Sequence, residues 1–546
     1  MTPDLPDSYY LDNVTTLFDH IEATYADILP AETIDFLKRF EDLDEDARKL
    51  YIRLLNRSYN WFRVSKLNYS EISSIEKAID KLCQFDCLRL NPEIPVDTLI
   101  SLFTKPELFS SQLIDSTWKT LRREELETKL LTWDNTDFYQ HLLSSDDFLE
   151  VIGNDQYQLC QMLFFGNLNQ SMTDFVLRDL GLNRYESYLI DLQHRPYQSS
   201  LEIQQHWLLY QLDALYRQIN QEDLESLSEC LDLIPADIES DAPAYRFSQH
   251  LRFEIARQIE RIGELDMALD AYQLCVLPPA RERVARIKNS QGQHKTSLHH
   301  CLEMIEEPLN DAELHFACQF ASRLCKRHQI ETPGIIQTHA ISHKPDIIDL
   351  ELDQHESVEA AVAEHLGQGC YYVENSLFNS VLGLLFWEVI FAPVSGAFYN
   401  PFQHRPSDLY TPDFHHRRQK QVEHLWQSIQ SNQDIWELVE KRWHEKHGVM
   451  NPLVMWQNME LEIIQLALER IGFKQWLAVF KRILLDIRGN RAGFPDLVHF
   501  PPEGGYQLVE VKGPGDTLQK NQQRWMQYFK QHQIPHYLAR VTWRKI

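Results

Sequence analysis

Three charged side chains in the last part of the chain have the types and spacing needed to cleave a phosphodiester bond. Asp496 follows a proline, and Glu510 and Lys512 stand two positions apart, so the segment spells Pro-Asp and then Glu-x-Lys. Two carboxylates can hold a divalent cation, and a neighbouring ammonium group can orient or deprotonate an attacking water molecule. The pattern therefore predicts metal-dependent phosphodiester hydrolysis, as in a nuclease.

A strand-turn-strand pattern would bring these side chains together. Residues 497–500 and 506–509 read as strands, and the prolines and glycines of 501–505 predict the turn between them. Folding this hairpin about the middle of the turn sets Asp496 opposite Glu510. The two carboxylates are thus expected to meet although they are distant in sequence.

The geometry of a strand also assigns the neighbouring positions. Residues two apart point to the same face, so Glu510 and Lys512 share a face while the Val511 side chain points to the other. Carboxylate oxygens suit Mg²⁺ or Mn²⁺, and the Val511 carbonyl could complete the protein's share of an octahedral shell. The alternative is a surface hairpin whose charges are merely solvated.

The segments on either side of the hairpin carry candidate DNA contacts. Residues 485–497 form a loop rich in arginine and glycine that delivers Asp496, and in it Arg488 and Arg491 present planar donor forks to phosphate oxygens. Beyond the lysine, a helical pattern carries Lys520 and Gln522 close to the same site. Gln522 either braces the metal-binding face or is an ordinary exposed helix glutamine.

The residues around the hairpin resemble a known nuclease family. Residues 488–498 read Arg-Gly-Asn-Arg-Ala-Gly-Phe-Pro-Asp-Leu-Val, and residues 508–514 read Leu-Val-Glu-Val-Lys-Gly-Pro. Both segments are similar to the VRR-NUC domain of the Fanconi-associated nucleases. The similarity also touches residues 371–378, 382–391, 51–54 and 61–67.

This resemblance implies roles for particular residues. The implied metal ligands are Glu374, Asp496, Glu510 and the carbonyl oxygen of Val511. Lys512 is the implied catalytic lysine, acting with the three carboxylates. Glu388 is a rival to Glu374, because both lie in the same apolar upstream segment.

The resemblance also implies an activity. Members of the family are implied to be 5′-flap endonucleases and 5′→3′ exonucleases that act in the repair of DNA interstrand crosslinks, and we expect Mg²⁺ or Mn²⁺ as the cofactor. A Holliday-junction-resolvase-like or restriction-like endonuclease would use the same metal-binding face as a symmetric dimer. A non-catalytic DNA-repair scaffold is a further alternative, although the three residues of the motif are all present.

Periodic apolar residues predict that most of the chain is helical. At 546 residues the chain should hold about three or four domains. We expect a predominantly α multidomain protein, with an all-helical N-terminal and repeat scaffold and a C-terminal α/β restriction-endonuclease-like PD-(D/E)XK nuclease domain. The expected domains are a helical N-terminal domain (1–70), a SAP-like DNA-binding region (71–135, by resemblance), a tetratricopeptide-like helical repeat domain (136–335) and the VRR-NUC domain (345–546).

Two basic clusters upstream of the nuclease segment are candidate nucleic-acid contacts. Arg63 and Lys66 interleave with aromatic residues, a pattern of cations and stacking rings that suits DNA. Core aromatics with solvated charges explain this segment nearly as well. Arg323, Lys326 and Arg327 recur along one predicted helix and could hold a terminal 5′ phosphate by family analogy, or could simply complement the helix dipole.

The formal net charge of −27 is unusual for a DNA-binding protein, so its distribution matters. Residues 474–546 hold 12 Lys and Arg against 5 Asp and Glu, whereas the rest of the chain holds 41 basic and 75 acidic residues. The nuclease segment is therefore locally basic within an acidic scaffold. This distribution predicts a confined DNA track and binding that weakens strongly with salt.

The cysteines and the first residues of the chain indicate the cellular compartment of the protein. The nine cysteines are scattered, as in a reducing compartment, and the polar, acidic first residues resemble neither a secretory signal nor a transit peptide. The apolar stretch 381–398 is broken by Glu388 and Pro393, so no membrane span is expected.

We expect a cytoplasmic protein, nucleoid-associated if bacterial, that binds branched or flapped DNA as a monomer. DNA-induced dimerisation and a repair-protein partner on the repeats are left open.

Overall fold

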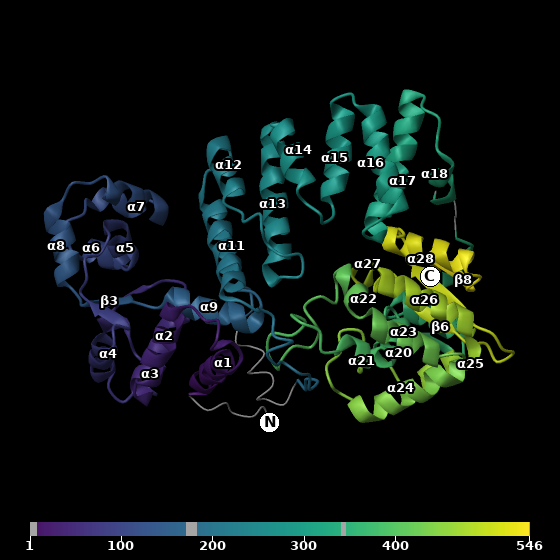
Figure 1. The fold of residues 1–546 in the computed structure, drawn as a ribbon, viewed down its shortest axis with the longest axis horizontal. Coiled ribbons are helices and arrows are strands. Elements are labelled where there is room, and N and C mark those ends of the chain that lie inside the picture. The colour runs from purple at the N-terminus through teal and green to yellow at the C-terminus, as the bar shows by residue number, and fades with distance from the viewer. Residues whose placement is uncertain (1–7, 171–182, 340–344, 545–546) are drawn as a thin grey trace. The chain divides into compact units, whose positions relative to one another are not determined.

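The computed structural model describes residues 8–170, 183–339 and 345–544, and the chain divides into two compact units, Met1–Leu182 and Asn183–Ile546 (Figure 1). Most described residues of both units lie in helices, which agrees with the predicted helix-dominated fold class. None of the described helices combines the length and the apolar character needed to span a bilayer. All nine cysteines are unpaired.

The first unit consists mainly of short helices. They are α1 (Tyr9–Tyr25), α2 (Ala31–Glu41), α3 (Glu45–Leu55), α4 (Ile75–Gln84), α5 (Val96–Ser101), α6 (Lys105–Ser110), α7 (Arg123–Leu131), α8 (Thr136–Ser144) and α9 (Asn154–Phe165), with 3-10 turns η1 (Val64–Lys66) and η2 (Ser116–Thr120). Local signals set their ends: the Asp44 side chain caps α3 by accepting a hydrogen bond from the Ala47 N–H at 2.9 Å. The helices then bury apolar faces against one another, such as Val14, Leu17 and Ile21 of α1.

A small antiparallel sheet in this unit corrects the expectation of an all-helical N-terminal part. The three strands β1 (Trp61–Arg63), β2 (Leu88–Leu90) and β3 (Phe148–Val151) pair in the order β1-β3-β2. Each strand is too short to show an alternating pattern, and β3 pairs with segments far away in sequence, for example Leu149 with Phe62. Residues 136–170, expected in the repeat domain, therefore belong to the first unit.

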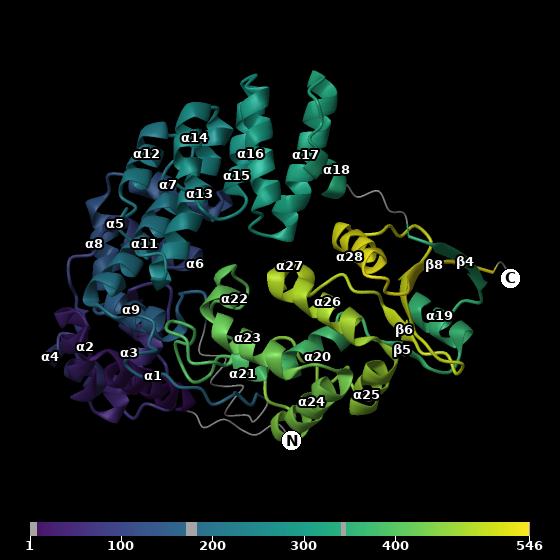
Figure 2. The ribbon, with the colours of Figure 1, turned by 45° about the vertical axis from the view of Figure 1, so that its right-hand side comes forward.

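The second unit begins with a row of helices that lie side by side (Figure 2). They are α11 (Ser200–Gln218), α12 (Leu224–Asp232), α13 (Pro243–Ile262), α14 (Leu265–Gln273), α15 (Ala280–Ser290), α16 (His294–Glu306), α17 (Asp311–His328) and α18 (Gly334–His339). Gly263, with φ +107°, ends α13 in a left-handed conformation and lets the chain turn into α14. Ala268, Ala271 and Tyr272 of α14 are buried in the core shared with α13, as the tetratricopeptide-like pattern requires.

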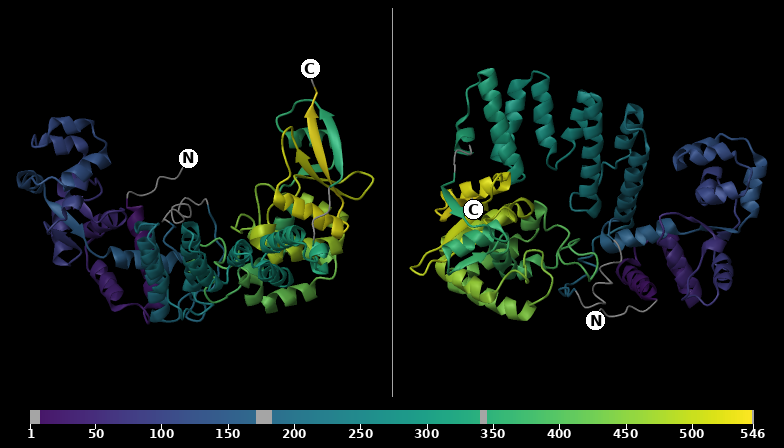
Figure 3. Two further views of the ribbon diagram at one scale, coloured as in Figure 1. Left: turned by 90° about the horizontal axis from the view of Figure 1, so that it is seen from above. Right: turned by 180° about the vertical axis from the view of Figure 1, so that it is seen from behind.

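The rest of the second unit is an α/β domain around a five-stranded sheet. The strands are β4 (Ile347–Leu352), β5 (Cys370–Tyr372), β6 (Leu497–His499), β7 (Gln507–Lys512) and β8 (His536–Trp543), in the order β4-β8-β7-β6-β5. Strands β4, β8 and β7 are parallel, whereas β6 pairs antiparallel with both β7 and β5. Figure 3 shows β4 and β8 side by side, the teal and yellow arrows of the left panel.

This domain also contains helices. They are α19 (Val358–Leu366), α20 (Leu377–Leu385), α21 (Trp387–Ile390), α22 (Asp413–Arg417), α23 (Gln419–Ser428), α24 (Asn432–Lys446), α25 (Leu461–Arg470), α26 (Phe473–Leu485), α27 (Ile487–Asn490) and α28 (Lys520–Gln531). Of these, α19 packs on one face of the sheet and α28 on the other. Val509 and Val511 pack in a small core with α19, whereas Leu508 packs in the larger core that holds Trp525 of α28. Alternate residues of the central strand β7 therefore face different layers, and Glu510 shares the face of Leu508.

Candidate active site

The β6–β7 hairpin places Asp496 and Glu510 as the sequence predicted. Leu497 pairs with Val509 in the antiparallel register, so the next position outward sets Asp496 opposite Glu510. The Val511 N–H donates a hydrogen bond to Asp496 Oδ2 at 2.8 Å, which joins the two strands at this point. Both carboxylates are buried, although ionised groups are rarely buried without compensation.

Two donors converge on one oxygen of Glu510. Lys512 Nζ lies 2.7 Å from Glu510 Oε1, and Gln522 Nε2, in the first turn of α28, donates to the same oxygen at 2.5 Å. Glu510 Oε2 is also buried but has no hydrogen-bond partner among the described residues. The structure thus places Gln522 against the carboxylate, and it leaves a buried acceptor that a cation would satisfy.

The electrostatics of the site reflect crowded negative charge. The pKa of Asp496 is raised to about 6, mainly by burial and in smaller part by the carboxylates of Glu374 and Glu359. The Val511 N–H and the charge of Lys512 act in the opposite direction. Burial, followed by the charge of Asp496, raises the pKa of Glu510 to about 8. Burial lowers the pKa of Lys512, but the hydrogen bond and the charge of Glu510 outweigh this effect and hold that pKa above its usual value. A divalent cation would relieve the repulsion between the carboxylates, and carboxylate oxygens are ligands that it prefers. Among the described residues, no group of three or more His, Cys, Asp or Glu side chains forms a ready-made metal site.

The structure separates the two rival acidic residues. Glu374 follows β5, where Tyr372 Oη donates a hydrogen bond to its Oε2, and its charge acts on both Asp496 and Glu510. Glu388 lies in α21 with its side chain 77% exposed, and it forms an ion pair with Arg442 of α24. Glu374 is therefore near enough to act electrostatically on both carboxylates, whereas Glu388 pairs with a different residue.

Sequence reasoning missed a polar link between these segments. Asn375, with φ +51°, accepts hydrogen bonds at its Oδ1 from the N–H groups of Gly493 at 2.9 Å and Phe494 at 3.2 Å. Asn379 Nδ2 in turn donates to the carbonyls of Asn375 and Arg491, each at 2.7 Å. An asparagine directly after a candidate ligand was the available signal, because asparagine tolerates left-handed backbone and can bond to a loop.

Gly493 is required in this loop for two reasons. Its φ of +92° disfavours side chains, and a Cβ there would lie 2.8 Å from Asn521 Nδ2 and 3.1 Å from the Asn521 carbonyl carbon. The loop can therefore pack against α28 while it delivers Asp496. Glu359, in the first turn of α19, is a further carboxylate near Asp496 that was not predicted as a site residue.

The predicted DNA contacts near the hairpin are accessible. Arg488, Arg491 and Lys520 are exposed. Arg491 donates to Tyr410 Oη at 2.9 Å and stacks over that ring, and Arg488 lines a cavity of about 230 Å³ with Tyr410 and Arg246. The loop that leads to Asp496 and the start of α28 thus present accessible cations, of which Arg491 is held by Tyr410.

The basic residues of α17 are also exposed. Arg323 and Arg327 line a cavity of about 180 Å³ with Arg286 and His328, whereas Lys326 is not part of its lining. Burial and the charges of neighbouring arginines lower the pKa of Arg286, which marks a concentration of positive charge. The structure thus adds Arg286 to the predicted cluster.

Arg63 and Lys66 belong to the first unit and differ in accessibility. The Arg63 side chain is only 10% exposed and forms ion pairs with Glu107 and Asp146, each at 2.9 Å. Lys66 is 58% exposed and pairs with Glu107 at 2.7 Å. Arg63 therefore serves an internal network in this structure, and Lys66 keeps an accessible charge.

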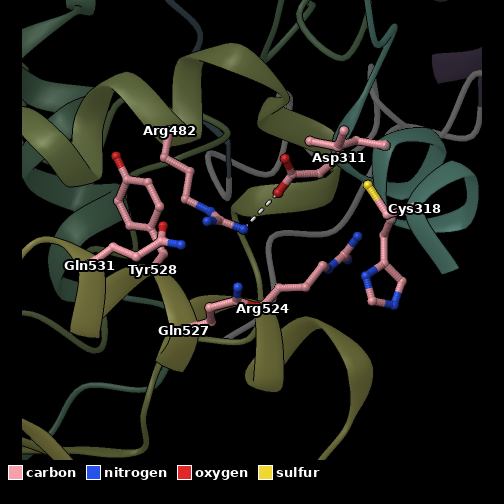
Figure 4. A pocket seen from close by; sticks show the side chains of 9 residues that line it. Asp311, Cys318, Arg482, Arg524, Gln527, Tyr528 and Gln531 are labelled. Carbon is pink, nitrogen blue, oxygen red and sulfur yellow. Dashed lines mark hydrogen bonds and ion pairs between the residues drawn. The ribbon is translucent and has the colours of Figure 1, made fainter. Parts of the chain in front are cut away.

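A second basic pocket, not anticipated from the sequence, lies between α17, α26 and α28 (Figure 4). Arg482 of α26 donates to Asp311 of α17 at 2.7 Å, and its guanidinium stacks on the rings of Trp525 and Tyr528. Arg524 lines the same pocket, and the figure shows its side chain extended toward α17. The row of helices, through α17, and the nuclease domain, through α26 and α28, both line this pocket.

Comparisons with known proteins agree with the geometry. Residues 430–543 match the family model of the VRR-NUC domain, and residues 8–89 match that of the FAN1 HTH domain. The chain is 32% identical to the Fanconi-associated nuclease 1 homolog of Pseudomonas aeruginosa, over 99% of this chain and 97% of that protein. It is 23% identical to human Fanconi-associated nuclease 1, of which it spans 58%.

Solved structures give the same result for the fold. A crystal structure of paFAN1 bound to DNA with a 2-nucleotide 5′ flap and a gap matches with a TM-score of 0.84 at 30% identity, covering 100% of both chains. A second, with a 1-nucleotide 5′ flap, matches with a TM-score of 0.81. The resemblance drawn from the sequence is thereby confirmed. The chain belongs to the Fanconi-associated nuclease family, and its α/β domain contains the VRR-NUC nuclease domain.

Proposed function

We propose that this protein is a metal-dependent DNA nuclease that cuts 5′ flaps, degrades 5′→3′ and acts in interstrand crosslink repair. The observation that carries the proposal is the cluster of buried Asp496 and Glu510 with the partly buried Lys512 on one face of the β6–β7 hairpin. The likeness over the whole chain to paFAN1 bound to 5′-flap DNA supports the choice of substrate. Nucleases of this family generally depend on a divalent metal.

The residues that would hold Mg²⁺ or Mn²⁺ are Glu374, Asp496, Glu510 and the carbonyl oxygen of Val511. When bound there, the cation would lower the pKa of a water molecule and offset charge that develops on the scissile phosphate. Gln522 and Lys512 both contact Oε1 of Glu510, which leaves the buried Oε2 without a hydrogen-bond partner among the described residues and available to a cation. Lys512, held as an ammonium group, donates a hydrogen bond that orients the attacking water or the phosphate.

The exposed cations would position the DNA without reading its sequence. Arg488, Arg491 and Lys520 hold phosphates beside the carboxylates, and Gln522 contributes from the same helix. On the helical row, Arg323, Lys326 and Arg327 hold the terminal 5′ phosphate. In the first unit, Lys66 contacts the DNA backbone, and Arg63 supports it through their shared partner Glu107.

The proposed function also predicts the location, the oligomeric state and the partners of the protein. We expect a cytoplasmic, nucleoid-associated enzyme if the source is bacterial, acting as a monomer on branched or flapped DNA. The helical row would be available for a repair-protein partner, as such scaffolds present extended surfaces.

A cleavage assay tests the proposal. End-labelled 5′-flap, 3′-flap, four-way-junction and duplex DNA would be incubated with Mg²⁺ or Mn²⁺ and the wild type, Asp496→Ala or Lys512→Ala. We expect metal-dependent cutting selective for the 5′ flap, with both variants reduced by about 10²–10⁴-fold. Paired nicks in the four-way junction would instead indicate a resolvase, and binding without cutting would indicate a scaffold.

A matched pair of variants tests the third carboxylate. Glu374→Gln should impair cutting and metal dependence, whereas Glu388→Gln should leave both near the wild-type level, because Glu388 is exposed and paired with Arg442. A loss of cutting in Glu388→Gln alone would reverse this assignment.

A further inference from the structure

The first unit contains a cavity of about 590 Å³ that the metal site does not use. It lies beside β1 and α5, and its lining combines aromatic rings with cations. The rings include Tyr59, Trp61 and Tyr69. Its volume is in the range of sites that bury a small organic ligand.

Tyr59 forms an exposed stacking surface at this cavity. Its side chain is 51% exposed, although it is a large ring in a folded unit. Its ring centroid lies 4.9 Å from that of Phe62, which is buried and anchored in β1. The two ring planes are tilted by 42°, and the exposed part of the Tyr59 ring can accept a second planar group.

The cations at the cavity differ in their availability. Arg57 is exposed, and its side chain has no hydrogen bond or ion pair in the described part of the chain. Lys66 is accessible and pairs with Glu107. Arg63 pairs with the same carboxylate, so the negative charge of Glu107 is neutralised without Lys66. The cavity therefore presents net positive charge next to stacking rings, within a chain of formal charge −27.

We propose that this cavity holds one unpaired nucleotide of the DNA substrate, with its base stacked on Tyr59 and a phosphate held by Arg57 and Lys66. A planar group that carries negative charge is the ligand that matches both features, and every base has a face that can stack. A base within a duplex has its faces covered by its neighbours, so the site selects a single-stranded segment. This inference rests on the proposed function, because it names a subsite for the same substrate.

A fluorescence experiment tests the proposal on the full-length protein. 2-Aminopurine would be placed at successive positions of the single-stranded arm of a 5′-flap DNA, and binding would be measured in EDTA so that no cutting occurs. We expect quenching at one or two positions. Tyr59→Ala should abolish it and weaken flap binding about tenfold or more, whereas Tyr59→Phe should retain both.

Matched variants separate this site from general charge effects. Arg57→Ala should weaken flap binding and reduce its salt dependence, whereas Arg89→Ala, which removes a cation 64% exposed and paired with Glu150 in the same unit, should change neither. Binding to blunt duplex should be the same for the wild type and Tyr59→Ala. Far-UV circular dichroism and the Tm of each variant establish that it is folded.

The outcomes distinguish the subsite from the nuclease. Flap cutting with Mg²⁺ by both the wild type and Tyr59→Ala, with no quenching in either, would overturn the nucleotide pocket and leave the proposed function standing. Equal losses of duplex and flap binding in Tyr59→Ala would also overturn the pocket. Quenching that requires Tyr59 in a protein that cuts no substrate would support the pocket and contradict the nuclease.

Discussion

Asn375 Oδ1 accepts a hydrogen bond from the Gly493 N–H at 2.9 Å. Asn375 follows Glu374 directly, and its own Nδ2 donates to Glu374 Oε1 at 3.2 Å, whereas Gly493 belongs to the loop that ends in Asp496. This asparagine side chain therefore joins two acidic residues that come from separate parts of the sequence. This link adds to a backbone hydrogen bond from the Val373 N–H to the Asp496 carbonyl oxygen at 2.9 Å, so two contacts hold the segments together.

Replacing this link should reduce catalysis. Asn375→Ala removes the acceptor for the N–H groups of Gly493 and Phe494, and we expect kcat to fall about tenfold because the loop that delivers Asp496 loosens. Unfolding should become easier by about 1–3 kcal/mol, the cost of leaving buried donors unpaired. Flap cleavage kinetics and urea denaturation measure the two effects.

Asn432→Ala is the matched control for this variant. Its Nδ2 donates to the carbonyls of Leu468 and Ile471, so its removal also costs two hydrogen bonds to the backbone. We expect a similar loss of stability with kcat unchanged. If both variants lowered kcat equally, Asn375 would have only a general structural role.

The buried carboxylates should make the metal-free protein less stable at higher pH. The pKa of Asp496 is raised to about 6 and that of Glu510 to about 8, so the folded state holds protons that the unfolded state releases near pH 4. Their stabilising contribution is fully present below about pH 4 and is lost as pH rises through 6 to 8. Each unit by which the pKa differs between the folded and the unfolded state changes the free energy of unfolding by about 1.4 kcal/mol. Thermal denaturation in EDTA between pH 5 and 8.5 measures it.

Glu510→Gln should flatten this dependence. Glutamine cannot ionise, so the variant should lose less stability between pH 5 and 8.5 and should exceed the wild type at pH 8.5. Adding Mn²⁺ should raise the Tm of the wild type, more at pH 8 than at pH 6, because the cation competes with protons for the carboxylates. A wild-type Tm that is independent of pH and metal would contradict the buried-carboxylate account.

Gln522 should act through Glu510. Gln522→Ala removes the donor 2.5 Å from Glu510 Oε1, so we expect weaker metal affinity, by about tenfold, with the fold intact. Activity titrated against Mn²⁺ gives the apparent affinity. Gln523→Ala is the control, since the adjacent side chain donates only to the Leu518 carbonyl. Identical metal titrations for the two variants would show that the hydrogen bond from Gln522 to Glu510 does not contribute to metal affinity.

The ion pair of Asp311 and Arg482 should contribute strongly to stability. Their side chains are only 13% and 12% exposed, so Asp311→Ala leaves a largely buried guanidinium without its partner. We expect a loss of about 3–5 kcal/mol, measured by denaturant unfolding. Asp213→Ala, which breaks an exposed helix pair with Arg217, should cost less than about 1 kcal/mol. Equal costs would mean that the Asp311 pair is effectively solvated.

The sequence by itself determined the local part of the site. A hairpin has a fixed two-residue period, and the prolines and glycines of 501–505 set its turn, so Asp496 had to oppose Glu510, and Lys512 had to share its face. The helical spacing of apolar residues likewise determined that the chain is dominated by helices. These features depend only on residues that are close in sequence.

The tertiary structure decided everything that joins distant segments. Glu374 and Glu388 lie in one apolar segment and carry the same charge, so the sequence could not separate them. In the structure Glu388 pairs with Arg442, whereas the charge of Glu374 acts on Asp496. Arg63 had the pattern of an exposed DNA contact, but Glu107 and Asp146 enclose it. The small sheet and the Asn375 link were hidden for the same reason. Hydrogen bonds and ion pairs between remote residues leave no period in the sequence, because their partners are chosen when the layers pack.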